Sequence, residues 1–599
     1  MSPSGCLYEG QALRFGQHLG NHRQATRFGV KMADDQPKQG TEQTGRQGEG
    51  HGTPGDQEDL PFNETAYLQA FPRLVPVIQN GRFSSAYDHY TQLGFKEKRL
   101  ESPNYRRAMA AQAVLRTGAA TAPVAVAAGP AVAPRGTDVH AGAAAAIAGG
   151  IDSVVAGSGG VVLVIGWLDD RADHLTTVTV HTETGGAFTT SAIARCRRAD
   201  AENAIGLTAG GYLLGFWCLV TCAPGAGRAV SLTATVGAQE LPYKISPRYV
   251  DDAQLRDTVF EYFAGAQYLG NPAIESYLQL DQGAGDALIA LNARMSGQII
   301  AGAFVERHGP SNRRFKASIV VCLYGKLEFF FIQHALFSAG KDCQDYELVY
   351  VCNSPELTDG LQREAKIAAQ IYGMSTTLVF LPGNAGFGAA NNVAVQYARS
   401  NRVLILNPDV FPRDGNWAVV HNAIIDSKPA DETLLFGAPL FYDDGSLMHG
   451  GMFFDIDRGL SIKPDGIISQ DLLRVEHYGK GSPPNSMRYR GSRAVPAVTG
   501  AFISADRDWF EKLGGFSEEY VFGHYEDADI CLKSFAAGKP SWLHDLPLWH
   551  MESKGSVRKR AHEGGTSVNR WHFTRTWIDL VRREMLGRTP DALVGADGG

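Results

Sequence analysis

The feature that most constrains the fold is a regular alternation of apolar strands and helices that begins near Phe315. The fully apolar run ASIVVCL precedes the helical pattern EFFFIQHALFSAG, and further helical segments separate the apolar runs YELVYVC, TTLVFL and RVLIL. Strands that alternate with helices of about ten residues or more are typical of βαβ units, whose parallel strands are buried on both faces. The sequence therefore predicts an α/β domain with a mostly parallel sheet.

The end of the last of these strands carries a carboxylate. In LILNPDVFP, Asp409 follows the apolar run and stands between Pro408 and Pro412. An isolated aspartate in such a place is most simply a turn residue or a helix cap. However, ligands of open α/β sheets bind outside the carboxyl ends of the strands. Asp409 is therefore also a candidate for a ligand loop at the mouth of the sheet.

Two other segments carry groups suited to a site. LPGNAGFGAANN combines a Gly-rich turn with a helix start, whose backbone N–H groups can face an anion or a sugar. YEDAD places Glu526, Asp527 and Asp529 where another helix begins. Acids in a first helical turn commonly complement the helix dipole. That explanation does not account for the Gly-rich, aromatic approach GGFSEEYVFGHY, so we interpret the cluster as a candidate site.

A histidine and a basic run lie near the end of the predicted domain. His550 follows the apolar run in LWHMES, and the run RKR occupies residues 558–560. As a surface feature the basic run would simply be solvated. Alternatively, it could close over a diphosphate or rest on an anionic membrane surface.

Composition limits the class of protein. With 599 residues and a net charge of −7, the chain is long enough for several domains and offers no bulk electrostatic case for nucleic-acid binding. The sequence contains no apolar stretch of about 18 residues or more. Its eight cysteines include no CxxC pair, which indicates a reducing compartment. We therefore expect a cytoplasmic protein.

Composition shifts divide the chain into seven segments. The first 60 residues are rich in Gly, Gln and charged groups, so disorder is expected there and Met32 is an alternative start to Met1. The expected order is a disordered segment (1–60), a small helical module (61–108), an Ala/Gly/Pro linker (109–150), a β-sandwich accessory domain (151–248), a helical connector (249–314), the α/β domain (315–585) and a flexible tail (586–599).

Six ordered segments of the α/β domain resemble family 2 glycosyltransferases of the GT-A fold, which have a Rossmann-like sheet. The matching segments are ASIVVCLYGK, VCNSPELTDGL, GNAGFGAANN, LILNPDVFP, VTGAFISADRDWFEKLGGFSEEYVFGHYEDADICLK and the pair His550 and Ser553. The rhamnosyltransferase-like branch is especially similar. The resemblance implies inverting transfer of a hexosyl or deoxyhexosyl group from a nucleotide-diphospho-sugar, with Mn²⁺ or Mg²⁺, to a glycan or lipid-linked acceptor in bacterial surface polysaccharide synthesis. If the basic run rests on an anionic membrane surface, where a lipid-linked acceptor would lie, the cytoplasmic protein would act at the inner face of the cell membrane.

The same resemblance implies roles for individual residues. Asp409 matches the last aspartate of the family's Asp-x-Asp metal motif, whose first position is Asn407 here, and His550 matches a second metal position. Asp527 matches the general base, with Glu526 beside it to hold the acceptor or to raise the pKa of the base by like-charge repulsion. The expected donor-binding residues are Leu323, Tyr324, Asn353, Asp359, Asn384, Gly386, Asn391 and Asn407.

One departure from the family pattern affects the donor. Cys352 stands where many members have an aspartate that contacts the nucleotide base, and a thiol is a weak hydrogen-bond acceptor. Base recognition would then move to Asn353, Asp359 or backbone groups. Two rival functions remain at this point: a nucleotidyltransferase, although CLYGKLEFF lacks a Gly-rich basic signature, and a non-catalytic glycan-binding or scaffold protein with a relic transferase domain.

Overall fold

The computed structural model describes Tyr67 and residues 147–586, apart from 208–211, 311–313, 341, 431, 464–465, 485, 487–488, 490 and 553–558. Most of the chain before residue 147, and the tail after Leu586, lie outside the described residues. The predictions of disorder at 1–60 and of the linker up to residue 146 fall there, as does the helical module at 61–108 except for Tyr67.

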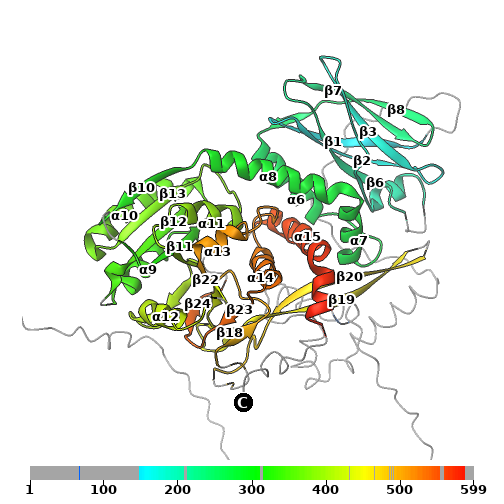
Figure 1. Cartoon of the computed structure of the whole chain (residues 1–599). Helices are drawn as coiled ribbons and strands as arrows, with labels where there is room; N and C mark the ends of the chain where they lie inside the picture. The colour runs from blue at the N-terminus through cyan, green and yellow to red at the C-terminus, as the bar shows by residue number, and fades with distance from the viewer. Residues whose placement is uncertain are drawn as a thin grey trace, which may run out of the picture. The chain divides into compact units, whose positions relative to one another are not determined.

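Two antiparallel-rich sheets form the first described region (Figure 1). One has the order β5-β6-β2-β1-β9 and the other β4-β3-β7-β8. Alternate residues of β2, β3, β6 and β7 fill a shared core that includes Val164, Val178, Phe216 and Leu232. The strands are β1 Gly149–Gly157, β2 Val161–Leu168, β3 Leu175–Thr182, β4 Ala187–Thr190, β5 Ile193–Cys196, β6 Gly215–Thr221, β7 Ala229–Val236, β8 Gln239–Lys244 and β9 Arg248–Val250, with the short helix α5 Ala199–Ala204 before β6.

Helices connect this region to the main sheet. They are α6 Asp252–Ala264, α7 Pro272–Gln279, the π-helical turn Leu280–Ala284 and α8 Gly285–Ala301. The side chain of Asp251 caps α6 by accepting a hydrogen bond from Gln254 N, and Asn271 caps α7 in the same way. The segment expected to be a purely helical connector also contains a strand, β10 Phe304–His308, which pairs with the edge of the main sheet. The sheet therefore begins before the expected boundary at residue 315.

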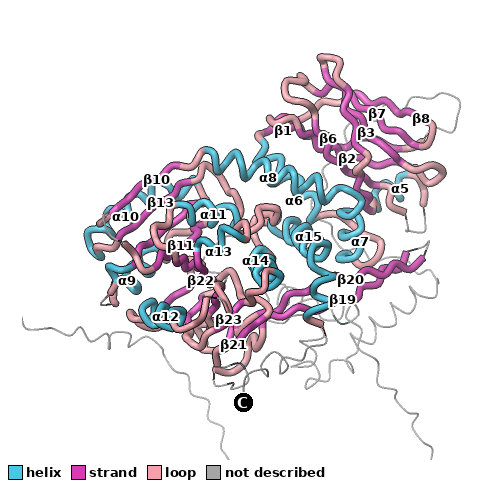
Figure 2. Tube along the Cα trace, viewed as in Figure 1, coloured by secondary structure: helices cyan, strands magenta, loops and turns pink. Residues whose placement is uncertain are grey.

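The main sheet has nine strands in the order β10-β13-β12-β11-β14-β22-β16-β23-β21. Its centre is parallel, with β11 Ala317–Leu323, β12 Tyr346–Cys352, β13 Ser375–Phe380 and β14 Arg402–Leu406. Helices α9 Phe330–Ser338, α10 Thr358–Tyr372 and α11 Phe387–Gln396 connect these strands (Figure 2). Strand order reverses between β11 and β14, because β12 and β13 lie on one side of β11 and β14 lies on the other.

The expectation of a mostly parallel sheet applies only to this centre. Strands β10 and β22 Phe502–Asp506 pair antiparallel with their neighbours, and so does β21 Arg493–Val495 with β23 Ser541–Leu543, whereas β16 Leu435–Gly437 pairs parallel with β23. Strands β16, β21 and β23 have only three residues each. Segments this short carry no readable hydrophobic period, so the mixed half of the sheet escaped prediction.

A small second sheet and a long hairpin complete the domain. The sheet has the order β15-β24-β17-β18, from Val410–Pro412, Leu548–His550, Leu440–Phe441 and Leu447–His449. The hairpin pairs β19 Met452–Lys463 with β20 Gly466–His477, and Figure 2 shows it as a long two-stranded ribbon. The remaining helices are α12 Trp417–Asp426, α13 Arg507–Lys512, α14 Glu526–Ala536 and α15 Arg560–Glu584. Within the described part of the chain, no helix combines the length and apolar character needed to cross a membrane.

Candidate functional site

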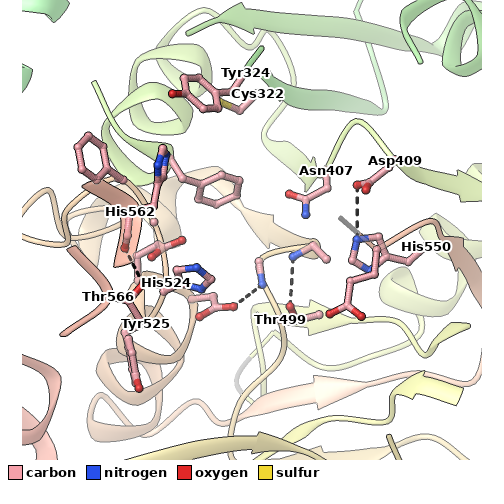
Figure 3. Close-up of a pocket in the computed structure, with 18 of the residues that line it drawn as sticks. Cys322, Tyr324, Asn407, Asp409, Thr499, His524, Tyr525, His550, His562 and Thr566 are labelled. Atoms are coloured by element: carbon pink, nitrogen blue, oxygen red, sulfur yellow. Dashed lines mark hydrogen bonds and ion pairs between the residues drawn. The ribbon is translucent and has the colours of Figure 1, made fainter. Parts of the chain in front are cut away.

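A cavity of about 470 Å³ opens at the carboxyl ends of the central strands. Cys322 and Tyr324 reach it from the end of β11, Asn353 follows β12, and Asn407 follows β14. The cavity thus lies beside the point where strand order reverses, which is the position where open α/β sheets bind ligands. Figure 3 shows the labelled side chains around the cavity, with Asp409 and His550 on one side and His562 and Thr566 on the other.

Asp409 and His550 form one end of the cavity. The His550 Nε2 atom lies 3.4 Å from the Asp409 Oδ1 atom, and both side chains are buried. Backbone pairing fixes this contact, because Val410 of β15 pairs with His550 of β24 and Met551 N donates to Asp409 O at 2.9 Å. Residues about 140 positions apart in the sequence are therefore held together by a β-ladder.

This pair fits a divalent cation that also binds a substrate. Asp409 offers a carboxylate oxygen and His550 an imidazole nitrogen, and the amide of Asn407 lines the same cavity. Moreover, the buried His550 Nδ1 atom has no hydrogen-bond partner among the described residues. The described residues contain no group of three or more His, Cys, Asp or Glu side chains arranged to hold a metal ion. Mg²⁺-type sites commonly use one or two carboxylates and take further oxygens from phosphates and water, which matches this partial set.

Asn353 organises the Gly-rich turn on the opposite side of the cavity. Its Nδ2 donates to Asn384 Oδ1 at 2.9 Å, and its Oδ1 accepts from Ala385 N at 2.8 Å. Asn384 Oδ1 also accepts a hydrogen bond from Gly386 N. Gly386 lies at the start of α11 and has a φ of +90°. Both ends of the Asn353 amide are thus engaged in shaping the turn, while Asn353 and Asn384 still line the cavity.

Aromatic side chains from three elements form the wall next to this turn. The His562 ring of α15 lies 4.7 Å from the Phe522 ring and 5.8 Å from the Tyr324 ring, measured between centroids. Behind them, the buried Arg256 of α6 lies over Phe522 and donates to Asn384 O at 3.0 Å. Helix α6 belongs to the segment predicted as a connector, so that segment helps to build the cavity wall.

Asp527 is presented to the cavity at the first turn of α14. Its Oδ2 accepts from Gly500 N at 2.7 Å and its Oδ1 from Ala528 N at 2.8 Å. Burial raises the pKa of Asp527, and these backbone donors act against that rise. Each carboxylate oxygen keeps a second lone pair, so Asp527 can still accept a proton or hydrogen bond from a ligand.

Glu526 lies beside Asp527 in an even less solvated position. Burial raises the pKa of Glu526 to about 8, and the negative charge of Asp527 adds to the rise. The Glu526 Oε2 atom is buried and has no hydrogen-bond partner among the described residues. Near neutral pH the two neighbouring acids therefore tend to keep one proton between them.

The backbone that leads to these acids is strained. Phe522, His524 and Tyr525 have positive φ values of 59°, 83° and 77°. Non-glycine residues adopt this region at a cost of about 1–3 kcal/mol each, and such residues cluster at functional sites. Asn569 of α15 holds the strained segment, because its Nδ2 donates to the carbonyls of Val521 and Gly523.

The structure brings together eight of the residues singled out from the sequence. Tyr324, Asn353, Asn384, Asn407, Asp409, Glu526, Asp527 and His550 all line the cavity. Leu323, Asp359, Gly386 and Asn391 do not line it. Leu323 is fully buried in the apolar core and Asp359 is exposed on α10. Asn391 donates to Phe387 O inside α11, and Gly386 shapes the turn. Cys352 is buried and donates to Ser354 O.

Several lining residues were not identified from the sequence. Among them are His477, Thr499, Glu552 and Thr566. His477 stands at the end of β20, and Thr566 is inside α15, so neither belongs to a strand exit of the parallel sheet. Arg558 of the basic run lies outside the described residues, whereas Lys559 and Arg560 are exposed at the start of α15. Asp529 instead joins α14 to α15, since it accepts from Trp577 Nε1 at 2.8 Å.

Comparisons with known proteins give distant likenesses. No family model matches the chain. A stretch of 240 residues is 28% identical to the uncharacterised protein y4gI of Sinorhizobium fredii (strain NBRC 101917 / NGR234), over 40% of this chain and 24% of that protein. The match thus spans about a quarter of the relative's length.

Two solved glycosyltransferase structures are also similar. The mannosyltransferase PcManGT from Pyrobaculum calidifontis, solved with GDP-Man and Mn²⁺, matches with a TM-score of 0.29 and 14% identity, over 56% of this chain and 90% of that one. GalNAc-T7, solved with UDP, GalNAc and Mn²⁺, matches with a TM-score of 0.33 and 14% identity, over 48% and 53%. With TM-scores this low, the roles of residues rest on the geometry of this chain.

Proposed function

We propose that this protein is an inverting glycosyltransferase that moves a sugar from a nucleotide-diphospho-sugar to a hydroxyl of a glycan or lipid-linked acceptor. One observation carries the proposal. A cation-type pair, Asp409 and His550, and an acid pair, Glu526 and Asp527, face one cavity at the switch point of an α/β sheet. This is the combination that a diphosphate leaving group and a hydroxyl nucleophile require.

In this proposal the donor lies along the carboxyl ends of the parallel strands. Tyr324, Asn384 and His562 line the part of the cavity suited to the nucleoside, where aromatic rings offer stacking surfaces. Asp409 and His550 would hold Mn²⁺ or Mg²⁺, whose chemistry is to neutralise the charge that develops on the leaving diphosphate. The amide of Asn407 offers both a donor and an acceptor beside that pair.

Asp527 serves as the general base in the proposed reaction. The acceptor hydroxyl forms a bond to the anomeric carbon from the face opposite the nucleotide, and the bond from that carbon to the diphosphate breaks with its electron pair. The hydroxyl proton passes to Asp527. The backbone donors Gly500 N and Ala528 N orient this carboxylate and favour its ionised form against the rise in pKa that burial causes, while the buried Glu526 holds a proton and avoids a second adjacent charge.

The acid pair also argues against a nucleotidyltransferase. When a nucleotidyl group is transferred to a sugar phosphate, the attacking group is a phosphate oxygen, which is already ionised near neutral pH and needs no base. A strained segment that presents the buried Glu526 and the half-buried Asp527 to the cavity would serve no step of such a reaction. The strain at Phe522, His524 and Tyr525 also argues against a relic domain that only binds glycans, because glycan binding alone does not require it. The proposed role in the synthesis of a bacterial surface polysaccharide rests on the family resemblance alone.

A donor screen tests the proposal. Thermal unfolding with Mn²⁺ and a panel of nucleotide-diphospho-sugars should identify the donor, because a ligand that binds only the folded state raises the melting temperature. The stabilising donor is then assayed for release of nucleotide diphosphate with saccharide acceptors, with Asp527→Asn as the inactive control. Wild-type protein that binds no nucleotide-sugar and releases no nucleotide diphosphate would overturn the proposal.

A further inference from the structure

Two histidines meet at the edge of the cavity beside His550. His449 is the last residue of β18 and is fully buried, and His477 is the last residue of β20 and lines the cavity. Their Nδ1 atoms lie 2.9 Å apart, in hydrogen-bond contact. Backbone bonds hold both strand ends, since Tyr478 N donates to Gly451 O at 2.8 Å and His477 pairs with Met452 of β19.

The contact between the two rings selects their tautomers. A hydrogen bond between two Nδ1 atoms needs one that carries a proton and one that is bare. The His449 Nε2 atom is buried and has no hydrogen-bond partner among the described residues. A buried N–H without an acceptor is rarer and costlier than a bare nitrogen. His449 therefore carries its proton on Nδ1 and donates to His477, which then carries its proton on Nε2.

This tautomer gives the cavity a neutral N–H donor. The His477 Nδ1 atom faces the buried His449, which leaves the Nε2 edge of the ring for the cavity that His477 lines. The charged and titratable groups around it are Lys480, Glu552 and His550, together with His449 on its Nδ1 side. Burial lowers the pKa of His477 to about 4, with the charge of Lys480 acting in the same direction, so the ring is neutral near pH 7.

The surroundings indicate what this donor would bind. The cavity that His477 lines is also lined by the apolar Met448, Met452 and Val475 and by the acidic Glu552. A neutral N–H donor near the Glu552 carboxylate suits a hydroxyl, which is uncharged, better than a phosphate, which the carboxylate would repel and which calls for cations or several backbone donors. On the proposed function, the uncharged oxygens that enter this cavity are carbohydrate hydroxyls.

We propose that His477 contacts the substrate by donating an Nε2–H hydrogen bond to a carbohydrate hydroxyl, and that His449 is the positioning residue that fixes the His477 ring. This inference rests on the proposed glycosyl transfer and adds a specificity-determining contact to it. The hydroxyl belongs either to the transferred sugar or to the acceptor, and the two sources differ in the kinetic constant that responds.

Two substitutions of His477 separate its two nitrogens. His477→Gln places an amide nitrogen near the Nε2 position and keeps a donor for the cavity, whereas His477→Asn places it near Nδ1 and removes that donor. We expect His477→Asn to raise KM for the substrate that carries the hydroxyl by about 10-fold or more. His477→Gln should keep this KM within about 3-fold of the wild-type value. The reason is that a site built to hydrogen-bond a hydroxyl binds its substrate much more weakly when that bond is lost. KM for the donor in acceptor-free hydrolysis reports the transferred sugar, and KM for the acceptor in transfer reports the acceptor.

His449 and a second histidine pair provide the positioning test and its control. His449→Asn keeps a donor near Nδ1 and should retain the wild-type KM, whereas His449→Leu should raise the same KM as His477→Asn does. His421 and His544 form a similar buried pair, with 2.8 Å between nitrogens, but neither lines the cavity. His421→Asn should therefore lower thermal stability and leave KM unchanged.

The outcomes distinguish this inference from the proposed function. If the wild-type enzyme is active and His477→Asn and His477→Gln have the same KM, the proposed role of His477 is overturned and the proposed function stays in place. Equal losses in both variants, with unchanged binding of nucleotide diphosphate and Mn²⁺, would also overturn it, because the donor kept by Gln would then not matter. Wild-type protein without any sugar transfer would overturn the proposed function and this inference together.

Discussion

The two chemical ends of the cavity are held in place by opposite means. At the cation end, the pairing of β15 with β24 holds His550 within a strand and Asp409 in the turn just before β15, and neither residue has a positive φ. At the base end, Glu526 and Asp527 begin a helix after a segment in which Phe522, His524 and Tyr525 all have positive φ. One end is thus secured by a regular ladder and the other by a strained turn that packing from α15 must hold.

Because the two ends are held differently, substitutions at the cation end and at the base end should have different effects. A ladder tolerates substitution of one side chain, because neighbouring backbone hydrogen bonds keep its geometry. A strained turn persists only where its surroundings over-determine it, and it presents side chains at angles that regular structure does not offer. We therefore expect changes at the cation end to affect ligand affinity, and changes at the base end to affect turnover and folding stability.

The largest effect is expected for Asp527→Asn. The amide keeps the shape of the side chain but cannot take up the proton of the acceptor hydroxyl, so kcat should fall by about 10²- to 10⁴-fold. The affinity for the donor should remain close to that of wild type. Steady-state kinetics and calorimetric donor titration check both expectations. A variant with kcat within a few-fold of wild type would show that another group acts as the base.

Glu526→Gln should change the pH dependence of stability. Because the folded-state pKa of Glu526 is raised from 4.5 to about 8, the folded protein holds a proton in this range that the unfolded chain has lost. The free energy of unfolding contributed by Glu526 is thus highest below pH 4.5 and falls as pH rises toward 8. Between pH 6.5 and 8 the fall amounts to about 1–2 kcal/mol, at about 1.4 kcal/mol for each pH unit.

Urea unfolding of wild type and Glu526→Gln at pH 6.5 and 8 measures this contribution. The neutral amide cannot ionise, so the variant should lose less stability than wild type over that interval. Asp529→Asn is the matched control, because Asp529 lies on the same helix and its carboxylate is paired with Lys533 at 2.7 Å. An identical pH profile for wild type and Glu526→Gln would contradict the raised pKa.

A smaller effect is expected from relief of strain at His524. His524 is exposed and has φ of 83°, a conformation that glycine adopts without steric cost. His524→Gly should raise the free energy of unfolding by about 0.5–1 kcal/mol, after the entropy that glycine adds to the unfolded chain is subtracted. His524→Ala keeps the strain and serves as the control. A glycine variant less stable than the alanine variant would show that the turn is not strained at this residue.

The parallel centre of the sheet was predictable from the sequence because its signal is local. The apolar runs of β11 to β14 and the helices between them each carry their own period, and the strand exits then point to Asn353, Asn407 and Asp409. The contact of Asp409 with His550 has no such local signal, because it depends on pairing between β15 and β24. Family resemblance named His550, whereas nothing in the residues near Asp409 pointed to it.

The missed part of the site has the same origin. His449 and His477 come together because the end of β18, which pairs with β17, meets the end of the β19–β20 hairpin, and both lie outside the parallel centre of the sheet. The sequence shows LMHGG and VEHYGKG as two unrelated segments. Likewise, Arg256 and His562 reach the cavity wall from α6 and α15. The hydrophobic pattern of a helix shows which of its faces is buried, but not which other segment packs against that face.

The most direct test of the account is the affinity of the nucleotide diphosphate in the presence and absence of Mn²⁺, measured by calorimetry for wild type, Asp527→Asn and Asp409→Ala. If the two ends of the cavity act as described, Mn²⁺ tightens binding for wild type and for Asp527→Asn alike, and this effect disappears in Asp409→Ala. Retention of the Mn²⁺ effect in Asp409→Ala, or its loss in Asp527→Asn, would contradict the division of the cavity into a cation end and a base end.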